Sequence, residues 1–163
     1  MTDRVTERSV VHASFTLERA YPSAPARVFS AWADPQFKIR WFAGGDEQVG
    51  EYRLDFRVGG RELARGTAPG DVAYVYDALY QDIVPNERIV FTYQMHIGEP
   101  RCSVSLATVE FRPDGAGTRL LYTEHGAFLD GIDDPKLREA GTAELLVSLA
   151  RALESEASAL GAS

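Results

Sequence analysis

The sequence predicts an α+β fold in which a bent antiparallel sheet wraps around a long C-terminal helix. Three observations predict it: a segment of period two near the N-terminus, a run of alternating segments from residue 50, and an amphipathic C-terminal segment. Consecutive antiparallel strands bury one face of their sheet, so that face needs a cover. At 163 residues and 45% apolar composition we expect one domain over residues 1–163, with its core at about residues 10–160.

The N-terminal part predicts one strand followed by two short helices. Apolar and polar side chains alternate over residues 10–21, as they do in a half-buried strand. Residues 25–33 instead show an apolar stripe at helical spacing, and the proline that follows Asp34 ends this helix. Asp34 is then expected to cap a second helix, in which Phe37 and Trp41 lie one turn apart.

Six strands and a long helix are predicted for the rest of the chain. Gly59-Gly60 is expected to form a two-residue hairpin turn, and Pro85-Asn86-Glu87 a type I turn. Asp134-Pro135 is typical of a helix start. The helix that follows is the only element long enough to cover the sheet, and its apolar stripe comprises Leu146, Leu149, Ala150, Leu153, Ala157 and Leu160.

Charge and cysteine content limit the classes of function. Residues 1–70 hold 10 basic and 9 acidic side chains, a charge of +1. Residues 71–163 hold 7 basic and 15 acidic side chains, a charge of −8, so the net charge of −7 arises from the second part of the chain. An acidic surface disfavours nucleic acid, no apolar run approaches the roughly 20 residues that span a bilayer, and no signal peptide is recognisable. The lone Cys102 suits a reducing compartment. We expect a cytoplasmic protein whose partner is a small hydrophobic molecule, with no nucleic acid and no membrane, and a homodimer is left open.

Two segments resemble a known family. Residues 25–42, PARVFSAWADPQFKIRWF, and residues 111–128, FRPDGAGTRLLYTEHGAF, are similar to the SRPBCC or START-like superfamily, in its branch named for the activator of the heat-shock protein 90 ATPase. The resemblance covers about residues 10–155. It implies the helix-grip fold, with a deep cavity between the sheet and the long helix. Members of the superfamily bind lipids, hormones and polyketides, and some cyclise or hydrolyse them. Many relatives begin the last helix with Gly-Trp, whereas here Thr142 follows Gly141.

Aromatic residues on the strands are the candidates for ligand binding. Tyrosine joins an apolar ring to a hydroxyl, so tyrosines on the concave face can orient a ligand that apolar rings hold. Strand alternation places Glu124 on the face of Leu120 and Tyr122, toward the cavity mouth, and directs His125 to the other face. The predicted ligand-binding residues are Phe37, Trp41, Tyr52, Tyr74, Tyr76, Phe91, Tyr93, Met95, Tyr122 and Glu124.

No motif in the sequence identifies an enzyme. The histidines and Cys102 lack the spacing of a zinc site, and phosphate loops and dinucleotide fingerprints do not occur, so no catalytic residue, metal or cofactor is predicted. A small-molecule-binding module is the leading interpretation. One alternative is a cyclase or hydrolase in which Glu124 or a tyrosine is the acid or base. Another is a chaperone-interacting domain, which would expose a large apolar patch.

Overall fold

The computed structural model describes residues 7–42, 48–68 and 70–161, except for the side chains of residues 48, 49, 68 and 158–161. Within these residues the order of elements is the predicted one: a strand, two short helices, six strands and a long helix. The elements are β1 (Val10–Tyr21), α1 (Pro25–Ala33), α2 (Pro35–Phe42), β2 (Gln48–Leu54), β3 (Arg61–Ala68), β4 (Val72–Val84), β5 (Arg88–Ile97), β6 (Arg101–Asp114), β7 (Gly117–Leu129) and α3 (Pro135–Gly161).

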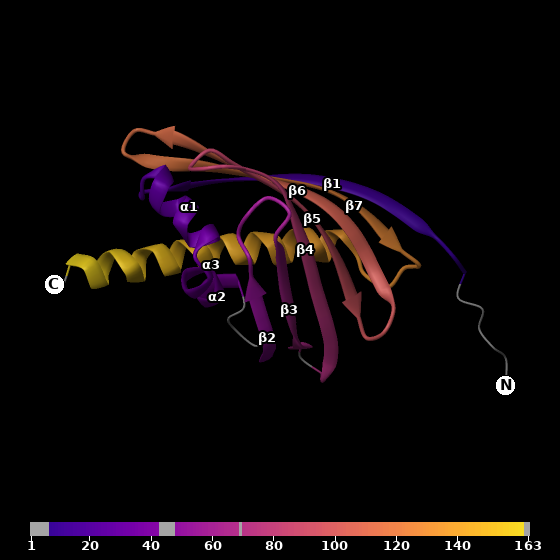
Figure 1. Cartoon of the computed structure of the whole chain (residues 1–163). Helices are drawn as coiled ribbons and strands as arrows, with labels where there is room; N and C mark the ends of the chain where they lie inside the picture. The colour runs from indigo at the N-terminus through magenta and orange to yellow at the C-terminus, as the bar shows by residue number, and fades with distance from the viewer. Residues whose placement is uncertain (1–6, 43–47, 69, 162–163) are drawn as a thin grey trace.

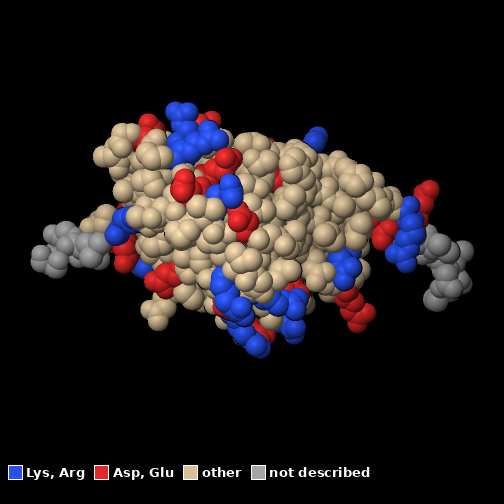
Figure 2. Space-filling model, turned by 45° about the horizontal axis from the view of Figure 1, so that its top comes forward, with Lys and Arg blue, Asp and Glu red and all other residues tan. Residues whose placement is uncertain are grey.

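All strands belong to one antiparallel sheet with the order β1-β7-β6-β5-β4-β3-β2. The sheet is strongly bent, and α3 runs along its concave side while α1 and α2 lie at one end (Figure 1). This arrangement confirms the predicted helix-grip fold. The convex side faces outward, and there Leu79, Val104 and Leu106 are exposed. Figure 2 shows an uncharged area on this side, and the charged groups around it combine both signs.

The helix boundaries follow from the predicted caps. The backbone N–H of Asp34 donates to the Ser30 carbonyl and ends α1, and the Asp34 carboxylate accepts a hydrogen bond from the backbone N–H of Gln36 at 3.0 Å. Asp134 caps α3 in the same way, because its Oδ1 accepts from the backbone N–H of Lys136 at 2.9 Å. The two helices that follow an Asp-Pro pair, α2 and α3, therefore begin where the sequence predicts.

The apolar stripe of α3 is buried over most of its length. Leu146, Leu149 and Leu153 are almost fully buried, and Ala150 is half-buried. Ala157, predicted to belong to this stripe, is exposed, because the last turns of α3 extend past the sheet (Figure 1). The predicted burial of Leu160 falls outside the described side chains. No helix in the described part of the chain is long and apolar enough to cross a membrane.

Two predicted turns have a different geometry. β2 and β3 are joined by residues 55–60 instead of a two-residue turn, and a Cβ at Gly60 would approach the Asp55 carbonyl oxygen to 2.0 Å. The turn after β4 closes with a hydrogen bond from the Glu87 N–H to the Val84 carbonyl, and its third residue, Asn86, has a φ of +65°. A positive φ at that position defines a type II turn, so the type I prediction was wrong.

Candidate functional site

A cavity of about 650 Å³ lies between the concave face of the sheet and α3. Trp32 of α1 and Trp41 of α2 line its inner end, where both rings are buried, and β4 and β5 supply further aromatic wall. At the other end Leu137 of α3 is 68% exposed and Val72 of β4 is 40% exposed. The cavity therefore has a blind end at the two short helices and a mouth at the first turns of α3.

Seven of the ten residues predicted to bind a ligand line this cavity: Trp41, Tyr74, Tyr76, Phe91, Tyr93, Met95 and Tyr122. The other three do not lie on the wall. Phe37 is buried in the core, where its ring packs under the guanidinium group of Arg40. Tyr52 is half-buried and donates a hydrogen bond to Glu62. Glu124 is buried behind the wall residues with which it forms hydrogen bonds.

The aromatic wall also presents polar groups that lack partners. The ring centroids of Tyr76 and Tyr93 are 4.9 Å apart, and those of Trp32 and Trp41 are 4.7 Å apart. Burial raises the pKa of the Tyr76 hydroxyl well above its ordinary value, so this hydroxyl stays protonated and can donate. It forms no hydrogen bond to another described residue. The indole N–H of Trp32 likewise has no partner in the described part of the chain.

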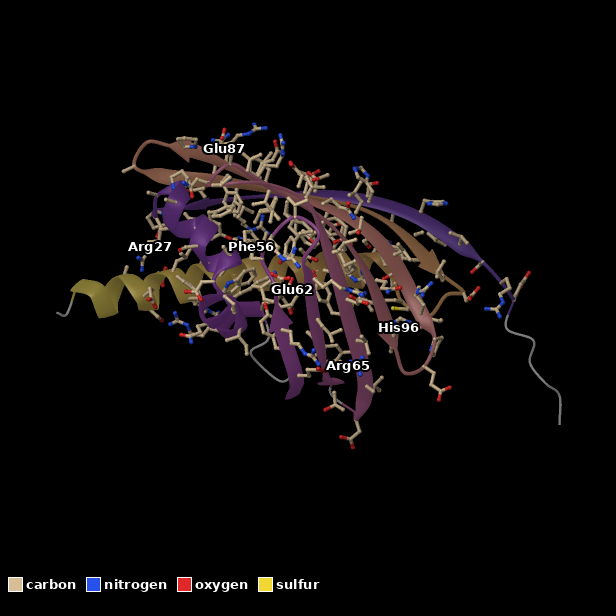
Figure 3. The ribbon with its side chains drawn as sticks, viewed as in Figure 1. Arg27, Phe56, Glu62, Arg65, Glu87 and His96 are labelled. Carbon is tan, nitrogen blue, oxygen red and sulfur yellow. The ribbon has the colours of Figure 1, made fainter. Side chains whose placement is uncertain are left out.

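The Lys38 cluster, a buried ion pair with two tyrosines, lies at the blind end and comprises Lys38, Glu62, Tyr52 and Tyr80. The Lys38 Nζ is 2.7 Å from the Glu62 Oε1, and the two side chains are 1% and 0% exposed. The hydroxyl of Tyr52 donates to the Glu62 Oε2 at 2.5 Å, and that of Tyr80 donates to Oε1 at 3.1 Å. Figure 3 shows Glu62 among the interior side chains, whereas Arg65 of the same strand lies at the outer surface.

Two opposing effects set the pKa of Lys38. Desolvation lowers the pKa of the ammonium group, the carboxylate of Glu62 opposes this, and the net direction is downward. The ring centroid of Phe42 lies 4.6 Å from the Nζ, which adds a cation–π contact. Lys38 precedes Trp41 by three residues and Phe42 by four, so all three share one face of α2.

The Arg138 cluster joins the start of α3 to the sheet and comprises Arg138, Glu124, Asp133, Tyr93, Tyr122 and Ser103. The Arg138 Nη2 donates to the Asp133 Oδ2 and the Ser103 Oγ, each at 2.8 Å. Its Nη1 donates to the hydroxyl of Tyr93 at 2.9 Å and lies 3.6 Å from the Glu124 Oε2. The guanidinium group therefore already has partners on both terminal nitrogens.

Glu124 points inward, on the face that strand alternation predicts, and His125 is exposed on the other face. The hydroxyls of Tyr93 and Tyr122 each donate to the Glu124 Oε1 at 2.8 Å. Because these two tyrosines form the wall, the Glu124 carboxylate lies behind it and does not enter the cavity mouth as the sequence predicted. Its oxygens hold the tyrosine hydroxyls in place and do not face the cavity.

The start of α3 leaves the cavity partly unfilled. Thr142 lies on the wall, and its hydroxyl donates to the Arg138 carbonyl at 2.9 Å. A Cβ added at the neighbouring Gly141 would meet no atom within 4 Å. The small residues at these two positions therefore leave room beside the start of α3.

Sequence reasoning missed three charged residues of the two clusters, Lys38, Glu62 and Arg138. Lys38 was detectable from its position on the apolar face of α2. Arg138 precedes Thr142 by four residues and Leu146 by eight, so it extends the apolar stripe of α3 toward the N-terminus. Glu62 precedes the buried Ala64 by two residues and therefore faces the core.

Besides the aromatic wall, the described residues include potential metal ligands and the single thiol. Within residues 7–42, 48–68 and 70–161, no three His, Cys, Asp or Glu side chains are grouped to hold a metal ion. Cys102 is buried, and desolvation raises the pKa of its thiol. The chemistry that the site offers is hydrogen bonding from hydroxyl, indole and ammonium donors on an aromatic wall.

Fold and site together define a helix-grip protein with an aromatic cavity between its sheet and its long helix. The chain belongs to the family described as "Activator of Hsp90 ATPase homolog 1-like protein", whose sequence model matches residues 22–154, within the SRPBCC superfamily. No curated protein matches the chain.

Solved structures from several bacteria share the fold. An uncharacterized protein from Rhizobium leguminosarum is 43% identical over 91% of this chain and 99% of its own, with a TM-score of 0.88. A protein from Rhizobium loti is 52% identical over 88% of this chain and 99% of its own, with a TM-score of 0.82. A protein from Chromobacterium violaceum, at 24% identity, covers 86% of this chain and 96% of its own with a TM-score of 0.72, a likeness of fold alone.

Proposed function

We propose that this chain binds a small molecule with an apolar, aromatic body in the cavity between the sheet and α3. The observation that carries the proposal is the cavity of about 650 Å³ with aromatic walls. Ligand sites are typically concave, largely apolar and of about 300–1,000 Å³, with a few polar groups that fix orientation. The Tyr76 hydroxyl and the Trp32 N–H supply such groups, since neither has a partner among the described residues.

Binding without chemistry is the function that the position of Glu124 favours. A general base must come within about 2.6–3.2 Å of the proton it removes, directly or through one water. The Glu124 carboxylate accepts hydrogen bonds from Tyr93 and Tyr122, which stand between it and the cavity. Burial also raises the pKa of both hydroxyls, so neither tyrosine is an effective base near neutral pH.

We further propose that binding occurs in the cytosol. This proposal rests on the single, buried Cys102.

Filling the cavity tests the proposal. Thr142→Trp places a large ring on the wall, and Val147→Trp makes a similar change on an exposed side of the same helix, away from the cavity. A solvatochromic naphthalene dye should bind the unaltered chain and Val147→Trp with similar micromolar affinity, about −8 kcal/mol, and should not bind folded Thr142→Trp. Native mass spectrometry of freshly purified protein should detect any co-purified ligand. Equal dye binding by both tryptophan variants would show that the dye, and the proposed ligand, bind elsewhere.

A further inference from the structure

Lys38 is a buried cation on the cavity wall whose hydrogen-bond donors are not all used. An ammonium group has three N–H donors. The Lys38 Nζ donates to the Glu62 Oε1 at 2.7 Å and to the Tyr80 hydroxyl at 3.4 Å. The described residues supply no third acceptor, and the ring centroids of Phe42 and Trp32 lie 4.6 and 5.4 Å from the Nζ. One N–H therefore has no acceptor among the described residues, and it lies beside the rings of Phe42 and Trp32 at the blind end of the cavity.

The charge of the Lys38 cluster limits what can accept that hydrogen bond. One ammonium and one carboxylate give the cluster no net charge, and both side chains are almost fully buried. A carboxylate from a ligand would add a second negative charge in a desolvated site, and that burial is costly. A ketone, amide or ester oxygen accepts the hydrogen bond without adding charge. The site therefore fits a neutral carbonyl group.

The other cation on the wall is a poorer site for such a group. Both terminal nitrogens of Arg138 already donate to the protein, and two carboxylates, Asp133 and Glu124, lie within 2.8 and 3.6 Å of them. Arg138 is also near the mouth, where the exposed Leu137 marks the opening. Three of the five N–H donors of Arg138 are used, but its two carboxylates give the Arg138 cluster a net negative charge, which disfavours an acceptor oxygen. The Lys38 cluster at the blind end carries no net charge and is therefore the better site for such an oxygen.

The geometry points to Lys38 as the recognition point for a neutral carbonyl oxygen of the ligand, with Glu62 excluding carboxylates from the same position. This inference rests on the proposed binding function and specifies its ligand class. Glu62 acts as a positioning residue, because it orients the ammonium group and balances its charge from behind the wall.

Three dyes on one ring system test the inference. Prodan carries a propionyl ketone on dimethylaminonaphthalene, a second dye carries a carboxylate at that place, and the parent ring carries neither. The unaltered chain should bind prodan about 10- to 100-fold more tightly than the parent ring, the contribution of a hydrogen bond to a charged donor. It should bind the carboxylate dye more weakly than prodan. The emission of prodan bound to the unaltered chain should also lie to the red of its emission when bound to Lys38→Met, because a hydrogen bond to the carbonyl shifts the emission to longer wavelength.

Changing the cluster should change the selectivity between the dyes. Lys38→Met should remove the preference for prodan over the parent ring. Lys136→Met, which removes the chain's only other lysine from an exposed position, should keep the preference. Glu62→Gln should raise the affinity for the carboxylate dye about tenfold or more, because the cluster then lacks its own counter-ion. If Lys38→Met does not fold, the Lys38→Met/Glu62→Gln double variant, which buries no charge in the cluster, should show the same loss of preference.

The outcomes separate the two proposals. If none of the dyes binds the unaltered chain, the proposed function itself fails. If all three dyes bind with equal affinity, or if the loss in Lys38→Met is the same for the parent ring as for prodan, the cavity binds ligands but Lys38 recognises no carbonyl. An unchanged ratio of carboxylate to parent-ring affinity in Glu62→Gln would overturn the role of Glu62.

Discussion

Glu124→Gln removes the central charge of the Arg138 cluster while preserving the size of the side chain. In the folded chain the Glu124 carboxylate is 1% exposed, accepts hydrogen bonds from Tyr93 and Tyr122, and lies 3.6 Å from Arg138. Breaking a buried ion pair costs about 3–5 kcal/mol, and one hydrogen bond to a charged group contributes about 1.5–3 kcal/mol. Arg138 keeps Asp133 as a partner at 2.8 Å, so we expect a loss near the lower end, about 3 kcal/mol.

The same substitution at an exposed ion pair is the control. Glu18 of β1 pairs with Arg119 of β7 at 3.0 Å, but both side chains are about half exposed, so Glu18→Gln should cost less than about 1 kcal/mol. Urea unfolding followed by circular dichroism measures both variants. With a denaturant slope of about 2 kcal/mol/M, Glu124→Gln should lower the midpoint by about 1.5 M and Glu18→Gln by less than about 0.5 M.

The comparison can refute the reasoning in a specific way. If Glu124→Gln and Glu18→Gln lower the midpoint equally, burial contributes nothing to the energy of the Arg138 cluster. The hydroxyls of Tyr93 and Tyr122 would then not be held by the carboxylate, and the argument that Glu124 is occupied behind the wall would lose its basis.

Two further predictions concern the core. Leu149→Ala, at a fully buried position of α3, should lower the free energy of unfolding by about 3–5 kcal/mol. Leu137→Ala, at an exposed position of the same helix, should change it by less than about 0.5 kcal/mol. Equal urea midpoints for the two variants would contradict the burial of the apolar stripe. Burial also raises the pKa of six tyrosines above the value of about 10 in the unfolded chain, so the folded state keeps protons that the unfolded state loses. The contribution of these tyrosines to stability is therefore fully present below about pH 10 and decreases as the pH rises above it. Absorbance at alkaline pH should show that they ionise only when the chain unfolds. The six residues are Tyr21, Tyr52, Tyr76, Tyr80, Tyr93 and Tyr122.

The order of elements could be predicted because each one has its own period in the sequence. Strand alternation and the Asp-Pro helix starts depend on neighbours in the chain, and the structure confirms both. The loop at residues 55–60 could not be predicted in the same way. The backbone N–H of Gly59 donates to the Tyr80 carbonyl, and the backbone N–H of Tyr80 donates to the Gly60 carbonyl. The end of the loop is therefore hydrogen-bonded to β4, next to the β3–β4 pair. Its geometry is set by a strand 20 residues further along the chain.

Strand alternation also located much of the aromatic wall, but the charged residues behind it were harder to predict. Lysine, arginine and glutamate are almost never fully buried unless they are paired, so each is expected at the surface when considered alone. Lys38 and Glu62 are 24 residues apart in the sequence, and neither predicts the other. Only the fold brings α2 against β3, and only then does the burial of both side chains become favourable.

The two halves of α3 make different contacts, and this difference explains how a stable fold can contain a cavity. Toward the C-terminus Leu149 and Leu153 pack into the core, so this half of the helix holds the sheet in its bent form. Toward the N-terminus Arg138 and Thr142 line the cavity, and the helix is attached there by hydrogen bonds that leave space beside them. A substitution at Thr142, whose hydroxyl bonds only within its own helix, should therefore alter ligand affinity more than stability, because the core contacts that hold the sheet are made by the second half.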